Sequence, residues 1–130
     1  LKQLEINEIM PQIKYDIHCK QHKIYNSIQK EFNITIGKKK TTIKLFEDKL
    51  IIDNMEMYYI TLKKWMMYKH HPSCDLFYIN NELMAIIYIQ FENKFDLLVF
   101  NNNLFTICML LADWYQDNDY DISDFLETIN

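Results

Sequence analysis

Glycine and serine are scarce in this chain of 130 residues and arginine is absent, which excludes several kinds of chemistry. Gly37 is the only glycine, so the chain cannot form a glycine-rich phosphate loop, a dinucleotide-binding fingerprint or a nucleophile elbow. All 14 basic residues are lysine, which excludes an arginine finger and a bidentate guanidinium grip on phosphate. The only serines, Ser27, Ser73 and Ser123, lack a local nucleophile motif. We therefore expect a protein that is not an enzyme.

Cysteine is also sparse and shows no disulfide pattern. Cys19, Cys74 and Cys108 form an odd set without close spacing, which is typical of reduced thiols inside a cell. No uninterrupted apolar run reaches the roughly 18 residues that cross a bilayer, and no charged-then-apolar leader opens the chain. These features predict a cytoplasmic protein. The chain begins at Leu1 rather than at methionine, which is compatible with a fragment of a longer protein.

The formal net charge of −4 is unevenly distributed along the chain. Residues 1–100 carry all 14 lysines and 12 of the 18 acidic residues, a net +2, whereas residues 101–130 carry six acidic residues and no lysine, a net −6. A charge of +2 is too small for non-specific binding to duplex nucleic acid, which needs several clustered cations. We therefore expect a protein or peptide partner and no nucleic acid.

An apolar content of 49% with 15% aromatic residues predicts a packed core, and the length fits a single domain over residues 1–130. Residues 1–33 are predicted to form a helical N-terminal segment, with a helix from Tyr15 to Glu31. Its apolar residues recur at separations of four and seven, which places them on one helical face. They are Ile13, Ile17, Ile24, Ile28 and Phe32.

Residues 34–100 change to a period of two and are rich in β-branched side chains, which predicts an antiparallel β region. The stretch from Met57 to Lys69 is predicted to form a strand pair near the middle of the sheet. Eight strand-like segments are expected: Ile34–Ile36, Thr42–Phe46, Leu50–Asp53, Met57–Thr61, Lys63–Lys69, Asp75–Ile79, Leu83–Phe91 and Phe95–Phe100.

Residues 101–130 are predicted to form a C-terminal helix and an acidic tail. One of the three asparagines Asn101, Asn102 and Asn103 is expected to cap an amphipathic helix from Leu104 to Tyr115, which would cover one opening of the sheet. The expected fold class is α+β: an antiparallel β-meander or sandwich with an N-terminal helix and a capping C-terminal amphipathic helix.

Two clusters of residues partly match metal sites. His18 and His22 lie one helical turn apart, and His70, His71 and Cys74 could complete a zinc site, but no spacing pattern forces these two segments together. Surface histidines are the favoured interpretation. Further along, three aspartates from position 117 to position 121 imitate the start of a calcium loop, but isoleucine stands where that loop requires glycine. We expect neither a metal nor a cofactor.

The segment Ile60-Thr61-Leu62-Lys63-Lys64-Trp65 resembles the Thr-x-Ile-basic-basic-Trp stretch of the third lobe of talin-type FERM domains. That lobe has the pleckstrin-homology-like fold shared with phosphotyrosine-binding domains, in which meander strands are closed by a C-terminal helix. The resemblance implies that Lys63, Lys64 and Trp65 lie beside a groove that takes an extended peptide by strand addition, with Trp65 as its apolar wall. The chain departs from the family in having no arginine, almost no glycine and one strand-like segment beyond seven.

The same resemblance implies that Lys38, Lys39 and Lys40 match a basic hairpin loop that meets acidic lipids. The expected function is thus a non-enzymatic interaction domain that binds an extended peptide at a sheet edge, with an acidic membrane surface as a second partner. The alternative is a small acidic α+β inhibitor, immunity protein or chaperone. Such a protein would present its acidic segment, Asp113 to Glu127, to a basic protein.

Overall fold

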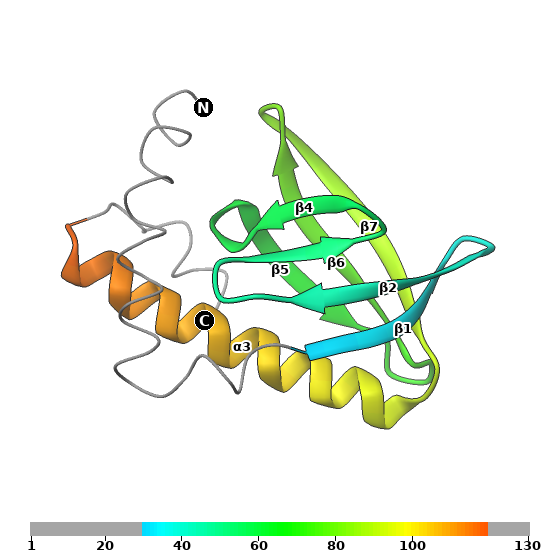
Figure 1. The fold of residues 1–130 in the computed structure, drawn as a ribbon. Helices are drawn as coiled ribbons and strands as arrows, with labels where there is room; N and C mark the ends of the chain where they lie inside the picture. The colour runs from blue at the N-terminus through cyan, green and yellow to red at the C-terminus, as the bar shows by residue number, and fades with distance from the viewer. Residues whose placement is uncertain (1–29, 120–130) are drawn as a thin grey trace.

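The computed structural model describes residues 30–119, which form seven strands, one short 3-10 turn and one long helix (Figure 1). In chain order these are β1 (Lys30–Ile36), β2 (Lys39–Leu45), β3 (Lys49–Ile52), β4 (Met55–Tyr58), η1 (Tyr59–Thr61), β5 (Leu62–Met67), β6 (Ser73–Asn80), β7 (Leu83–Phe91) and α3 (Lys94–Asp117). The α+β class with an antiparallel sheet and a C-terminal helix is confirmed.

The predicted helix from Tyr15 to Glu31 falls mostly on residues 1–29, which lie outside the described residues. Its last two residues, Lys30 and Glu31, are described and belong to β1. The strand begins four residues earlier than predicted, because Lys30 is already in register with Leu45 of β2. The helical spacing of Phe32 with the preceding isoleucines therefore does not continue into the fold.

All seven strands belong to one antiparallel sheet with the order β4-β3-β2-β1-β7-β6-β5. The first and last strands within residues 30–119 meet at its centre, where β1 pairs with β7 only at Ile34↔Phe91 and Thr35↔Gln90. This short junction lets the sheet bend into two layers. Figure 1 shows β1 to β4 in front of β5 to β7, with α3 lying across one open side.

The stretch from Met57 to Lys69 does not lie in the middle of the sheet. It contains the end of β4 and all of β5, which are the two edge strands, joined by η1. The centre is instead made by the pairing of β1 with β7, strands that are far apart in sequence. Local patterns of side chains carry no information about such long-range pairing, which is why the prediction of a central position was wrong.

The predicted strand from Phe95 to Phe100 is also wrong, because these residues form the beginning of α3. The side chain of Asn93 accepts a hydrogen bond from the Asp96 N–H at 2.8 Å, and this N-cap starts the helix eight residues before the expected cap at Asn101 to Asn103. The β region predicted over 34–100 thus ends at Phe91, and the sheet has seven strands rather than eight.

Hairpin turns form almost without glycine in this chain. Gly37 (φ 61°) makes the turn between β1 and β2. The turn between β3 and β4 uses Asp53 (φ 47°) and Asn54 (φ 72°), and the one between β6 and β7 uses Asn81 (φ 50°) and Glu82 (φ 69°). Two successive residues at positive φ are the hallmark of a tight hairpin turn whose twist matches that of the strands.

The core lies between the two strand layers and α3. Alternate residues of the strands point inward, as at Ile43, Leu45, Leu50 and Ile52, all buried. From the helix, Phe100 contacts Phe32 of β1 and Phe91 of β7, at ring-centroid distances of 5.8 Å and 4.9 Å. One helix face therefore joins both halves of the sheet into one hydrophobic cluster.

By length and composition alone α3 could cross a bilayer, since an 18-residue window within it has a mean hydropathy of 1.5. Core helices of soluble proteins share that property. In this fold the apolar character of one face is explained by burial, because eight residues of α3 are buried against the sheet: Leu97, Phe100, Leu104, Ile107, Cys108, Leu111, Ala112 and Trp114.

Candidate functional site

The outer edge of β5 is the candidate site, because within residues 30–119 this strand has a neighbour only on its β6 side. The hydrogen bond from the Tyr68 N–H to the Ser73 carbonyl, 2.9 Å long, shows which residues of β5 form hydrogen bonds with β6. Hydrogen-bonded pairs alternate along an antiparallel ladder, so Met66 bonds to β6. Trp65 and Met67 therefore direct their N–H and C=O groups away from β6, toward the open edge.

Trp65 lies where this edge meets the helix. It is in register with buried Leu76, so its side chain points to the inner face, and it is half-buried. The indole Nε1–H donates a hydrogen bond to Oδ1 of Asn101 in α3, at 2.8 Å. Trp65 thus ties the edge strand to the helix, and the residue stays partly accessible beside the open edge.

The two lysines of the predicted set lie differently from Trp65. Lys63 is the inserted residue of a bulge between Leu62 and Lys64. Lys64 points to the outer face, where its Nζ lies 4.6 Å from the centre of the Phe77 ring, a cation–π contact. Lys64 and Trp65 therefore flank the edge on opposite faces of β5, and they do not line one common wall.

Apolar side chains are exposed on the outer face of β5 and β7, which sequence reasoning missed. We call the set Met66, Tyr68, Met84, Ile86 and Tyr88 the outer patch; between 37% and 59% of each is accessible. The Tyr68 and Tyr88 rings meet edge to face at 5.5 Å. The signal for this patch is in the sequence of β7, LMAIIYIQF. Residues that point to either face of this strand are apolar, unlike those of a strand with one solvated face.

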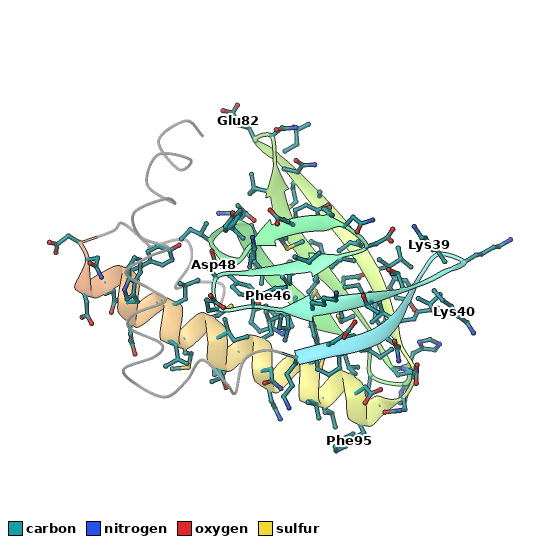
Figure 2. The ribbon with its side chains drawn as sticks, viewed as in Figure 1. Lys39, Lys40, Phe46, Asp48, Glu82 and Phe95 are labelled. Atoms are coloured by element: carbon teal, nitrogen blue, oxygen red, sulfur yellow. The ribbon has the colours of Figure 1, made fainter. Side chains whose placement is uncertain are left out.

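Lys38, Lys39 and Lys40 are all exposed at the end of the β1–β2 hairpin, where Figure 2 shows Lys39 and Lys40. The Lys39 Nζ lies 2.8 Å from a carboxylate oxygen of Asp53. This hydrogen bond, with a second one from the Thr41 hydroxyl, lowers the pKa of Asp53. In the sheet order, β7 and β6 separate this hairpin from β5, so the two predicted lysine sets belong to different places on the fold.

A hollow of about 430 Å³ opens beside the hairpin, where β1, β2 and the end of β7 meet. Its polar lining comes from Asn33, Thr35, Lys40, Thr41, Thr42 and Glu92. The carboxylate of Glu92 stands in the same lining as the Lys40 ammonium. The hollow is therefore of mixed charge and is not a dedicated anion site.

The residues weighed as metal ligands or nucleophiles are dispersed or buried. Within residues 30–119 no three His, Cys, Asp or Glu side chains gather, while His18, His22 and Cys19 lie outside the described residues. Ser73 Oγ lies 3.1 Å from Nδ1 of His71, but Ser73 is fully buried, so its hydroxyl cannot meet a substrate. Of the three aspartates that imitate the start of a calcium loop, Asp117 and Asp119 are described, and both are exposed.

The two buried thiols are chemically quiet. Burial, with a smaller effect from the Asp75 carboxylate, raises the pKa of Cys74 to about 12. Burial likewise raises the pKa of Cys108. Both thiols therefore stay protonated near neutral pH, whereas a reactive cysteine needs a thiolate.

No protein-family model matches the sequence, and no curated protein matches it. What the chain does must therefore be argued from its geometry. That geometry offers an open strand edge, a flanking tryptophan and an exposed apolar face.

Proposed function

We propose that this chain is a non-enzymatic interaction domain with a pleckstrin-homology-like fold, and that it binds an extended peptide at the open edge of β5. Two features support the fold assignment. The strand order joins the first strand to the last, and the long helix follows the last strand directly and closes one side of the sheet. The strand count of seven also removes the excess strand that set the sequence apart from that family.

The observation that carries the proposal is the outward direction of the Trp65 and Met67 backbone groups. A peptide that adds a strand gains hydrogen bonds from these groups, and its side chains then alternate between two surfaces. One set contacts the inner side at Trp65 and Met67. The other set contacts the outer side at Lys64, Met66 and Tyr68, next to the outer patch.

A proline at position 67 tests the proposal. Peptides are selected against the wild-type protein from a phage-displayed random library, and their affinities are measured for Met67→Pro and Met67→Ala. The Met67 N–H faces the open edge, so proline removes one donor to the peptide and spares the β5–β6 ladder. Met67→Pro should weaken binding by at least about tenfold, which corresponds to about 1.4 kcal/mol.

The matched variant Met67→Ala keeps the N–H and removes the side chain, so it should bind within a few-fold of the wild type. Thermal unfolding of both variants shows that the sheet is intact. If the library yields no peptide, or if Met67→Pro binds the selected peptides as tightly as the wild type, binding at this edge is wrong.

An acidic membrane surface is the proposed second partner, at the hairpin that carries Lys38, Lys39 and Lys40. Three exposed lysines could each contribute about 1 kcal/mol near an acidic surface. The ion pair of Lys39 with Asp53 competes with that contribution. Vesicles with and without phosphatidylserine, tested against the triple alanine variant, measure the effect; equal binding in all arms would remove this part of the proposal.

The acidic end of α3 supports the alternative of an inhibitor or chaperone for a basic protein. Asp113, Asp117 and Asp119 are exposed, and the last turn of the helix contains no basic residue. Replacing these three aspartates with asparagine would abolish binding to a basic partner and leave peptide binding at β5 unchanged. Recovery of a basic protein with the wild type, but not with that variant, would favour the alternative.

A further inference from the structure

The solvent side of α3 carries large apolar residues where an isolated surface helix would carry polar ones. Phe95, Leu98, Phe105 and Met109 recur at helical spacing on this side, and they are 73%, 45%, 42% and 46% exposed. Toward the C-terminal end the same side becomes acidic at Asp113, which is also exposed. We call this row of exposed residues on α3 the stripe. Its half from Phe105 onward combines exposed apolar surface with negative charge.

The described fold places the start of β1 beside the middle of α3. Phe32, two residues after the start of β1, contacts Phe100 with ring centroids 5.8 Å apart. Figure 1 shows the first residues of β1 beside the middle of α3, with the strand running away from the orange C-terminal half of the helix. Since Lys30 is only two residues from Phe32, the point where residues 1–29 join the described fold lies near the middle of α3.

The sequence before Lys30 is complementary to that surface in pattern and in charge. Residues 13–29 place isoleucines at positions 13, 17, 24 and 28 on one helical face. They also carry Lys14, Lys20 and Lys23 against the single acid Asp16, a net +2. As a helix these 17 residues would span about 25 Å, which matches the length of α3 from Phe100 to its end at Asp117.

The C-terminal residues 120–130 suit the same surface less well. They have apolar residues at helical spacing, but their charges are Asp121, Asp124 and Glu127, with no lysine. Packing them along α3 would bring like charges beside Asp113 and Asp117. Charge complementarity therefore favours the N-terminal segment as the occupant.

We propose that residues 13–29 dock as an amphipathic helix on the outer side of α3, with the isoleucines over Phe105 and Met109 and the lysines near Asp113 and Asp117. In this arrangement the segment runs toward the C-terminal end of α3, and the N-terminal half of the stripe, at Phe95, stays open. This inference rests on the surface of α3 and is independent of peptide binding at β5.

A photo-crosslinker placed in the full-length chain tests the docking. Phe105 is replaced by benzoylphenylalanine, which suits an exposed aromatic position, and Phe95 is replaced in a matched variant. After illumination, crosslinked peptides are mapped by mass spectrometry. Position 105 should crosslink to residues 13–29 within the same chain, in several-fold higher yield than position 95.

A charge reversal provides a second measurement on the same crosslink. Asp113→Lys with Asp117→Lys should lower the yield from position 105, and adding Lys14→Glu with Lys20→Glu should restore it. Crosslinks to residues 120–130, crosslinks between two chains, or equal yields from positions 95 and 105 would each overturn the proposal.

Discussion

Trp65 belongs both to the core and to the open edge of β5. Its inner position is dictated by the register with Leu76, and its orientation is fixed by the 2.8 Å hydrogen bond to Asn101. An indole needs a hydrogen-bond acceptor when it is buried, which explains why a polar asparagine lies at this point of an otherwise apolar helix face. The hydrogen bond and the packing thus hold Trp65 in one orientation within the fold itself.

Because several ionisable side chains are buried, we expect this protein to lose stability at alkaline pH. The Cys74 pKa is raised from 9.0 to about 12, chiefly by burial, and burial also raises the pKa of Cys108 and, strongly, that of Tyr59. The folded state keeps these protons while the unfolded chain releases them. The resulting stability is complete below the unfolded pKa and is lost as pH rises toward the folded value.

We therefore expect the free energy of unfolding to fall above about pH 9, by about 1.4 kcal/mol per pH unit for each buried thiol once the unfolded chain is ionised. Urea unfolding across this range measures the slope. Cys74→Ala should make the decline shallower by about one thiol's share, whatever its effect on stability at neutral pH. A decline of the same steepness in wild type and Cys74→Ala would contradict the assignment.

At the scale of elements, α3 shows where a sequence pattern was ambiguous. The stretch from Phe95 to Phe100 has apolar residues at alternate positions, as a strand does, but Leu97 and Phe100 also continue the helical spacing of the later residues. A short polar signal distinguishes the helix from a strand: Asn93 caps the helix, and Asp96 is an acidic residue in its first turn.

Removing that cap should cost stability. Asn93→Ala loses the acceptor for the Asp96 N–H, and we expect a loss of about 1 kcal/mol in the free energy of unfolding by urea. Asn102→Ala is the matched control, because Asn102 is exposed within the helix and alanine there should be neutral or stabilising by about 0.5 kcal/mol. The reverse ranking of these two variants would place the start of the helix near Asn102.

The strands were mostly predictable because their patterns are local. The segments found from a period of two, such as Leu50–Asp53 and Leu83–Phe91, correspond to β3 and β7. The candidate site was less predictable, since the open edge depends on which strands pair. Lys63, Lys64 and Trp65 were named from a short resemblance, whereas the exposure of Ile86 and Tyr88 depends on no described element covering that face.

At the scale of the whole molecule, the layer of β1 to β4 and the layer of β5 to β7 share one core, to which α3 also contributes. The front layer contributes Phe32 and the rear layer Phe91, and each packs against Phe100 at a ring distance below 6 Å. The direct pairing between the layers is limited to two residue pairs of β1 and β7. Side-chain packing on the helix, more than backbone pairing, should therefore make the layers unfold together.

Phe100→Ala tests this coupling. Loss of a fully buried phenylalanine should reduce the free energy of unfolding by about 3–5 kcal/mol. Phe95→Ala, on the same helix but 73% exposed, should change the free energy of unfolding by no more than about 0.5 kcal/mol. Hydrogen exchange then distinguishes cooperative from independent layers: in Phe100→Ala the amides of Ile43 and Ile89 should lose protection together. Faster exchange in only one of the two layers would show that each layer holds its structure without the other.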